Sequence, residues 1–238
     1  SRGSRRIWRY LNHKSRRSLY YLLRNKLGSI TCVATSEPVA ALTCDDGPHP
    51  LYTPQLLDIL DKHNAKATFF LVGEVAGKYP DLVRMISRSG HAIGNHSWDH
   101  PLFPGLKTRH RWSQIYRCSR ATKPHGQRLF RPPFGAEDHE VQLDAFLLGY
   151  KVVKWNLSFT DWLSQDSDTL SKKIIESVSR GSILLLHDSI YCSKVPDTQW
   201  DRGPVLEALD MALTELRDNY RFVTIPALLR SGRAVKSS

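Results

Sequence analysis

The sequence predicts an α/β protein, built as an irregular (β/α) barrel with about seven parallel strands inside and helices outside. From residue 39 onward, short apolar runs alternate with longer amphipathic segments, which is the pattern of βαβ units and a parallel sheet. About seven such runs occur, which suits a barrel better than an open sheet, although periodicity alone leaves the open sheet as an alternative. A chain of 238 residues is long enough for one barrel of this kind.

The expected elements follow from these runs in order. The expected strands lie at residues 39–44, 67–72, 91–95, 128–131, 150–155, 182–187 and 221–225. The expected helices lie near residues 53–63, 80–89, 106–121, 138–148, 168–179 and 204–218. Parallel neighbouring strands need a long crossover connection, and these helices supply it.

The positive charge of the chain is concentrated near its first residue. The formal net charge is +11, yet residues 1–28 hold nine of the 34 Lys and Arg residues and no acid. The remaining 25 basic residues nearly balance the 23 acidic ones. We therefore expect a basic N-terminal leader at residues 1–37, a main domain at 38–232 and a C-terminal tail at 233–238.

The leader also carries apolar residues at helical spacing. Leucines at positions 19, 22, 23 and 27 would share one face of a helix, and Trp and Tyr residues lie nearby. Such a helix can lie on an anionic membrane surface, bind nucleic acid, or pack its leucines on the domain behind it. We favour packing or membrane-surface contact through residues 1–28. Nucleic acid is the disfavoured partner, because no recognised nucleic-acid motif accompanies the charge.

The sequence leaves the cellular compartment open. No apolar run approaches the roughly 18 residues of a membrane span, and no signal peptide is visible. The chain opens at Ser1 without a methionine, so we expect the cell envelope or secretion if an upstream signal or anchor has been removed. Four cysteines, Cys32, Cys44, Cys118 and Cys192, show neither CxxC spacing nor a disulfide framework, and we expect each to be a small buried residue.

Polar residues of catalytic type follow several of the expected strands. The segment "LTCDDGPHP" places Asp45 and Asp46 side by side, which alone would indicate no more than a polar turn. In a parallel barrel, however, the loops that follow the strands converge on one face. The residues in those positions are Asp45, Asp46, His96, His100, Arg131, Asp161, Trp162, His187 and Asp188. A solvated-loop interpretation fits any one of them but does not predict their joint placement.

The segment "HSWDH" indicates a metal site. His96 and His100 can reach one ion if the segment is helical or turn-like, and a carboxylate from another loop would complete a His₂-carboxylate site with an open position. Zinc is the leading candidate for one divalent ion, and Co²⁺, Ni²⁺, Mn²⁺ or Fe²⁺ would be chemically tolerable. The spacing is a weak signal alone, and it becomes strong beside the Asp-Asp turn and a later strand that ends in His.

These segments resemble the motifs of the polysaccharide deacetylases, carbohydrate esterase family 4, which are built on the NodB-homology domain. The resemblance runs from about Val39 to Arg230 and does not reach the basic leader. It identifies residues 38–232 as the catalytic domain. The matching segments, in the family's order, are "TCDDGP" at 43–48, "HSWDH" at 96–100, "RPPFG" at 131–135, "SFTDW" at 158–162 and "GSILLLHD" at 181–188.

The resemblance implies a metal-dependent hydrolysis of N-acetyl groups. Asp46, His96 and His100 would hold the metal, whose open positions take a water and the carbonyl oxygen of the N-acetyl group. Asp45 would be the general base, and Arg131 would hold its carboxylate in place. Two neighbouring aspartates would thus divide the work, one on the metal and one on the proton.

The resemblance assigns the other side of the reacting carbon as well. His187 would be the general acid that protonates the leaving amine, with Asp161 orienting and charging its imidazole. The backbone N–H of Phe134 would help to stabilise the tetrahedral oxyanion. Leu185 and Trp162 would form the walls of the acetyl pocket, although plain core packing explains them nearly as well. For Asp188 we expect only a loop or helix-cap residue.

The sequence departs from the family pattern at two positions. Cys44 stands where the family has Phe or Tyr, and because strand side chains alternate it should point away from Asp45 and affect packing only. Ser158 replaces the first Asp of the fourth motif. The implied substrate is a glycan with N-acetylglucosamine-type units, such as a chitin oligomer, peptidoglycan or an exopolysaccharide. The alternative is a non-catalytic carbohydrate-binding relative of the same fold.

Overall fold

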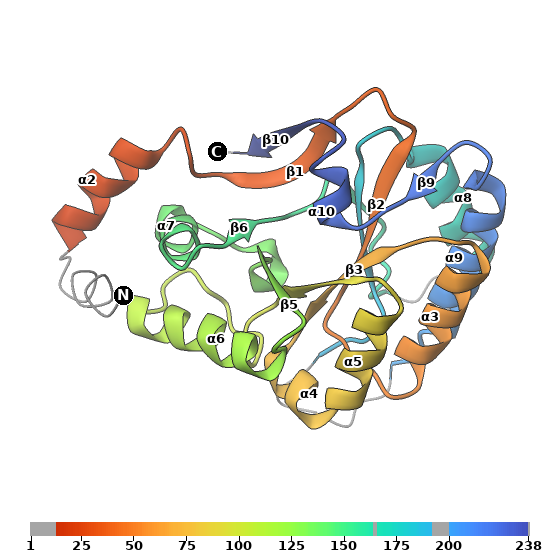
Figure 1. The fold of residues 1–238 in the computed structure, drawn as a ribbon, viewed down its shortest axis with the longest axis horizontal. Helices are drawn as coiled ribbons and strands as arrows, with labels where there is room; N and C mark the ends of the chain where they lie inside the picture. Colours follow the sequence, from red (N-terminus) through yellow and green to blue (C-terminus); the bar gives the residue numbers. More distant parts are fainter. Residues whose placement is uncertain (1–12, 164–165, 192–199, 238) are drawn as a thin grey trace.

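The computed structural model describes residues 13–163, 166–191 and 200–237, and its centre is a curled sheet of parallel strands surrounded by helices (Figure 1). The strand order is β6-β5-β4-β3-β2-β8-β7, and β9 pairs with β2. Every pairing within this sheet is parallel. The predicted irregular (β/α) barrel is therefore confirmed.

Each of the seven expected apolar runs overlaps a strand. These strands are β2 (Val39–Asp45), β3 (Ala67–Leu71), β4 (Ala92–Asn95), β5 (Gly126–Phe130), β6 (Lys151–Val152), β8 (Ile183–His187) and β9 (Arg221–Phe222). An eighth strand, β7 (Leu157–Ser158), was not expected. It follows β6 after residues 153–156 only, and because β6 and β7 are opposite edges of the sheet, this short link crosses the opening of the half-barrel.

Strand β2 shows why the chain folds this way. All seven of its residues are buried, and its side chains alternate between two apolar clusters. Ala40, Leu42 and Cys44 belong to the cluster that also contains residues of α3, α8 and α9. Val39 and Ala41 belong to the cluster that contains Phe70 and Val153. Cys44 therefore packs away from Asp45, as its place in the strand predicts.

The helices also follow the expected order. They are α3 (Tyr52–Lys62), α5 (Pro80–Arg88), α6 (Thr108–Ala121), α7 (His139–Leu147), α8 (Ser167–Ser177) and α9 (Gly203–Leu216). Two short helices, α4 (Gly73–Lys78) and α10 (Ile225–Leu228), were not expected. Two glycines within the six residues of α4 hide its helical pattern from sequence analysis. Among the described helices, none combines the length and the apolar character needed to cross a membrane.

The expected leader and the expected tail each contain a strand. β1 (Ser29–Ala34) pairs antiparallel with β10 (Arg233–Ser237). β1 also forms single bridges to Val153 and Ser182, so it lies across the gap between the β6 and β8 sides of the sheet. Gly181, at φ +79°, permits this approach, since a Cβ there would lie 1.7 Å from the Val33 carbonyl oxygen.

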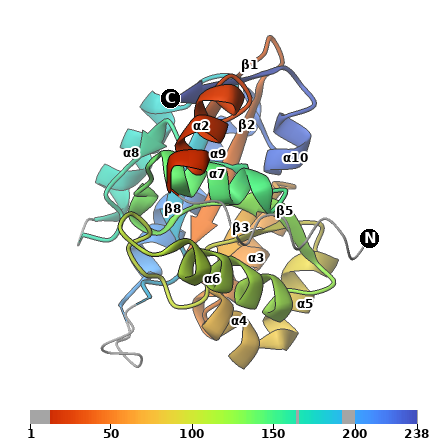
Figure 2. The same cartoon turned by 90° about the vertical axis from the view of Figure 1, so that its left-hand side faces the viewer.

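The described part of the basic leader begins with a helix, α2 (His13–Leu23), which lies beside α7 in both cartoon views (Figures 1 and 2). It contacts α7 through Arg16 and through the Tyr20 ring, which stands edge-on to His139 with ring centroids 5.3 Å apart. Buried Arg16 pairs with Glu140 and Asp144, each at 2.6 Å, whereas Leu22 is 80% exposed. The basic residues before position 13 and Cys192 lie outside the described residues.

Candidate active site

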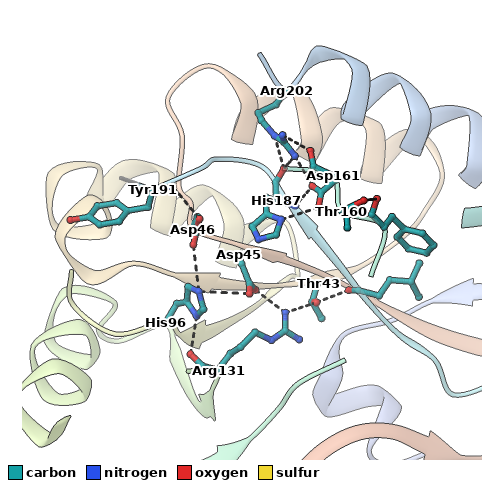
Figure 3. Close-up of polar contacts among 12 residues, drawn as sticks. Thr43, Asp45, Asp46, His96, Arg131, Thr160, Asp161, His187, Tyr191 and Arg202 are labelled. Carbon is teal, nitrogen blue, oxygen red and sulfur yellow. Dashed lines mark hydrogen bonds and ion pairs between the residues drawn. The ribbon is translucent and has the colours of Figure 1, made fainter. Parts of the chain in front are cut away.

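A cavity of about 460 Å³ opens where the parallel strands end. It brings together eight of the ten residues expected to form the site, and Arg131 and Asp161 lie directly behind two of them (Figure 3). The residues that line it are Asp45, Asp46, His96, His100, Phe134, Gly135, Trp155, Trp162, Leu185, His187, Ile190 and Tyr191. The expected convergence of loops on one face of the barrel is therefore observed.

Asp46, His96 and His100 form a compact group of ligand atoms. One atom from each residue lies within 4.8 Å of the others. The Oδ1 atom of Asp46 is 3.4 Å from Nε2 of His96 and 3.3 Å from Nε2 of His100. Nitrogen from two imidazoles with one carboxylate oxygen is a donor set that suits zinc and similar divalent ions.

The backbone that presents these ligands is a pair of tight turns. Asp46 has φ 74° directly after β2, and in the second segment Ser97 has φ 70° and His100 has φ 55°. Such left-handed conformations are uncommon for residues other than glycine and persist where the surroundings hold them. Here the Ser97 Oγ accepts the His100 N–H at 3.0 Å. "HSWDH" is therefore turn-like rather than helical.

The groups around the three side chains leave one position ready for a cation. Nδ1 of His96 lies 2.8 Å from the Arg131 carbonyl oxygen, which directs Nε2 toward Asp46. The backbone N–H of Tyr191 donates to Oδ2 of Asp46 at 3.0 Å. Oδ1 of Asp46 is buried and accepts no hydrogen bond from the described residues. A buried carboxylate oxygen without a donor, facing two imidazoles, fits a bound metal ion.

The protonation states of this group also suit a metal. Burial lowers the pKa of His100 to about 4, so its imidazole is neutral and has a free lone pair near neutral pH. Burial alone would raise the pKa of Asp46. The imidazoles of His96, His100 and His187 outweigh that effect and lower it well below its ordinary value. Asp46 is therefore anionic, as a carboxylate that holds a cation must be.

The other aspartate of the pair is held in a different way. Oδ1 of Asp45 accepts a hydrogen bond from Nη1 of Arg131 at 2.7 Å, and Oδ2 lies 3.7 Å from Nε2 of His96. Arg131 is fully buried, and its other N–H groups donate to Thr43 Oγ1 and to the carbonyls of residues 153 and 154. The fixed guanidinium orients Asp45 with one oxygen on the arginine and the other toward His96.

His187 lies at the end of β8 and is coupled to Asp161. Its Nδ1 lies 2.9 Å from Oδ1 of Asp161, which leaves Nε2 as the other ring nitrogen of a residue that lines the cavity. Burial lowers the pKa of His187, but the hydrogen bond and charge of Asp161, with Asp46 and Asp45, raise it to about 9. In the metal-free protein the imidazole is therefore protonated at neutral pH.

Arg202 completes this pair, and sequence analysis missed it. Nη2 of Arg202 lies 2.5 Å from Oδ2 of Asp161, and Nη1 donates to the Asp161 carbonyl at 2.8 Å. Nε and Nη2 also donate to the His187 carbonyl, at 3.1 and 3.0 Å. The residue is 3% exposed and directly precedes α9. One guanidinium therefore ties the loop before α9 to both members of the pair.

The three residues expected to contact the substrate differ in exposure. The Leu185 side chain is buried, Trp162 is 39% exposed, and Phe134 is 68% exposed. The Trp162 ring stands edge-on to His187, with centroids 5.6 Å apart, and the Phe134 ring stands edge-on to His100 at 4.5 Å. Phe134 has φ 59°, and its N–H donates to no acceptor in the described part of the chain. These features agree with a small pocket beside the group formed by Asp46, His96 and His100.

Asp188 lies in a loop, as expected, but it is buried beneath the first turn. It accepts a hydrogen bond from Thr53 Oγ1, while its Oδ1 has no partner among the described residues. A Cβ on Gly47 would lie 2.7 Å from both carboxylate oxygens, so only glycine fits between Asp46 and Pro48. Burial raises the pKa of Asp188 to about 6. Ser158, which with Cys44 departs from the family motifs, is exposed on β7.

Comparison with known proteins shows which family the chain is similar to. The polysaccharide deacetylase family model matches residues 33–153. The chain is 33% identical to the peptidoglycan-N-acetylglucosamine deacetylase PgdA of Listeria monocytogenes. The match covers 79% of this chain and 38% of that relative. The chain is also 33% identical to the chitooligosaccharide deacetylase of Azorhizobium caulinodans, with 80% of this chain and 94% of that protein covered.

Solved structures give the same answer. The Bc1960 peptidoglycan N-acetylglucosamine deacetylase matches with a TM-score of 0.78 and 28% identity, covering 90% of this chain and 99% of that one. A CE4 family pseudoenzyme from Bacillus anthracis matches with a TM-score of 0.76 and 27% identity, covering 87% and 70%. With the family model over half of the sequence and a curated relative covered almost completely, the chain belongs to the polysaccharide deacetylase family.

Proposed function

We propose that this chain is a metal-dependent deacetylase that hydrolyses the N-acetyl group of N-acetylglucosamine-type units in a glycan and releases acetate. The observation that carries the proposal is the arrangement around one cavity. An Asp-His-His group lies between a carboxylate held by Arg131 and an imidazole held by Asp161. Hydrolysis of an amide needs these three parts, an electrophilic centre, a base for water and an acid for the amine.

Asp46, His96 and His100 would hold one divalent ion, with zinc favoured by the two imidazoles and Co²⁺, Ni²⁺, Mn²⁺ or Fe²⁺ also accepted. Such an ion supplies Lewis-acid chemistry, because it polarises an amide carbonyl and makes a nearby water more acidic. The Arg131 carbonyl oxygen orients the His96 ring toward the ion. The unpartnered Oδ1 of Asp46 supports this assignment.

Asp45 would accept the proton of the attacking water. Its Oδ1 is occupied by Arg131, so Oδ2, which faces the metal ligands, is the oxygen available for the proton. As the water oxygen bonds to the carbonyl carbon, negative charge develops on the carbonyl oxygen, and the Phe134 N–H would stabilise it. The left-handed backbone at Phe134 and its unengaged N–H support that role.

His187 would act as the general acid. Its raised pKa makes it a proton donor at neutral pH, and Nδ1 is engaged with Asp161, so Nε2 would deliver the proton. The amine nitrogen takes that proton as the C–N bond breaks, which leaves acetate and a free amine on the sugar. Asp161 and Arg202 would position the imidazole, while Leu185 and Trp162 would enclose the acetyl methyl group.

The proposed partners follow from the relatives and from the leader. The curated relatives are named for peptidoglycan N-acetylglucosamine and for chitooligosaccharides, so we propose an N-acetylated glycan of one of these types as the substrate. We also propose contact with an anionic membrane surface through residues 1–28. The exposed Leu22 and the uneven charge of the sequence support that contact.

One experiment tests the activity. Acetate release should be measured from chitin oligomers, peptidoglycan fragments and an N-acetylated exopolysaccharide, before and after chelation and after metal is restored. We expect release from at least one glycan, loss of release with chelator, and recovery with zinc. Binding of a glycan by the metal-loaded protein without any acetate release would favour the alternative, a non-catalytic carbohydrate-binding relative. The pseudoenzyme among the structural neighbours makes this control necessary.

A further inference from the structure

A second cavity, of about 350 Å³, lies at the other end of the barrel from the candidate active site. It is formed by the leader, α7, β6 and the residues around β10 (Figure 1). Val152 lines this cavity, whereas Trp155, three residues further along the chain, lines the active-site cavity. The link through β6 therefore runs from one cavity to the other. The volume of the second cavity lies within the range of small-ligand sites, roughly 300–1,000 Å³.

The charge around this second cavity has one sign. Lys26, Lys151 and Lys236 line it, and no acidic residue does. Within the described ranges, neither Lys26 nor Lys151 has an acidic partner within 4.0 Å. Lys236 Nζ donates to the carbonyls of Lys26 and Leu27, at 2.8 and 3.3 Å. These hydrogen bonds hold its ammonium group beside two other residues that line the cavity. Such a cavity attracts an anion.

One of the residues that line this cavity carries a buried, unpaired acceptor. Gln142, on α7, lines the cavity and is 6% exposed, and its Oε1 has no hydrogen-bond partner among the residues that the structure describes. An unpaired buried carbonyl oxygen costs free energy, which a donor from a bound molecule would recover. Phe146, one helical turn further on, lines the cavity too. The ligand should therefore carry a hydroxyl group as well as an anionic group.

The rest of the lining is apolar, and it continues toward an exposed apolar surface. Leu27, Ile30 and Leu229 line the cavity, and the helix that leads into Lys26 exposes Tyr21 and Leu22, at 53% and 80%. The lining therefore suits a ligand with an anionic group, a hydroxyl donor and an apolar part. An anionic phospholipid with a glycerol headgroup has all three, whereas free phosphate has no apolar part.

We propose that this cavity binds the phosphoglycerol headgroup of an anionic phospholipid at a membrane surface. The phosphate lies among the lysine ammonium groups, a glycerol hydroxyl donates to Gln142 Oε1, and Tyr21 and Leu22 contact the acyl region. The inference rests on the membrane contact proposed above and adds its binding site. It also gives the protein an orientation, with the active-site cavity opening away from the bilayer and toward a glycan.

Vesicle binding by the full chain tests the proposal. The probes are phosphatidylcholine vesicles that contain either phosphatidylglycerol or phosphatidylmethanol, which has the same charge but no headgroup hydroxyl. The variants are Gln142→Leu, Lys151→Gln and the control Lys172→Gln, an exposed lysine of α8 away from the cavity. The melting temperature of each variant checks that it is folded. Acetate release from a soluble oligomer tests the deacetylase proposal independently of vesicle binding.

We expect tighter binding to phosphatidylglycerol than to phosphatidylmethanol, and loss of that preference in Gln142→Leu. Lys151→Gln should weaken binding about five-fold, the usual effect of one basic residue at an anionic surface, and Lys172→Gln should not. Equal effects of the two lysine variants would overturn the cavity assignment and leave only a general charge contact of the leader. If the protein bound soluble glycerol 1-phosphate but did not bind vesicles, the assignment of a phospholipid as the ligand would be wrong.

Discussion

Asp161 contacts His187 through both of its carboxylate oxygens. Oδ1 lies 2.9 Å from the ring Nδ1, and Oδ2 accepts the backbone N–H at 2.8 Å. The first contact selects the tautomer and charge of the imidazole, while the second fixes the carboxylate relative to β8. The acid side of the proposed mechanism depends on this pair.

Asp161→Asn should lower the rate and shift its pH dependence. Asp161 raises the pKa of His187 toward about 9, so the protonated acid persists until the pH rises through that value. Without the charge the pKa falls, and the high-pH limb of kcat should move to lower pH, with a loss on the order of 10²-fold at the optimum. In the metal-loaded enzyme the high-pH limb should lie below 9, because a bound cation would offset the charges of Asp45 and Asp46, which raise the pKa of His187. Profiles of kcat from pH 5 to 10 check this, and an unchanged high limb would contradict it.

Arg202→Lys should reduce kcat more than it changes KM. Lysine keeps the charge but cannot make the contacts that one guanidinium makes to Asp161 and to the His187 carbonyl. Misplacement of the imidazole by a fraction of an ångström should cost on the order of 10-fold in kcat. The matched control is Arg217→Lys, at the exposed end of α9. Equal kinetics for the two variants would show that Arg202 only anchors the loop.

Asp188→Asn should stabilise the metal-free protein at alkaline pH. Burial raises the pKa of Asp188 from 3.8 to about 6, so the folded state favours the protonated acid. Its contribution to stability is present below the unfolded pKa and is lost as the pH rises through about 6. Asparagine keeps an acceptor for Thr53 and removes a cost of up to about 3 kcal/mol at pH 8.

Thermal unfolding in the presence of chelator measures this effect. Asp188→Asn should raise Tm at pH 8 by several degrees and have little effect at pH 4. The exposed residue Asp218 provides the control, since Asp218→Asn should shift Tm at neither pH. A fall in Tm at pH 8 would show that the Asp188 carboxylate is needed in its charged form.

The strands and the motif residues could be predicted from the sequence because they are local patterns. The alternation of Ala40, Leu42 and Cys44 with Val39 and Ala41 reports the two faces of β2 directly. The strand ends then locate the polar residues, since parallel strands finish on one face. This reasoning predicted the barrel and the polar residues around the cavity, whereas Phe134 and Leu185 were expected only from the resemblance to the family.

Features that depend on distant contacts could not be predicted in this way. β1 and β10 pair across about 200 residues of sequence, and neither looks like part of the barrel by itself. Arg202 follows no apolar run, so its position gave no sign that it reaches Asp161 and His187. Asp188 was expected to be an ordinary loop residue, because its burial depends on packing against Gly47 and Thr53 from a different part of the chain.

The division of labour between Asp45 and Asp46 is most directly tested by measuring metal content and acetate release on the same samples of Asp45→Asn and Asp46→Asn. Asp45→Asn should keep about one divalent ion per chain and lose on the order of 10²-fold or more in turnover, because it removes the base but no ligand. Asp46→Asn should lose the ion, and excess zinc should restore part of its activity. Near wild-type turnover by metal-loaded Asp45→Asn would contradict the account, since the first carboxylate of "CDDGP" would then be only a turn residue.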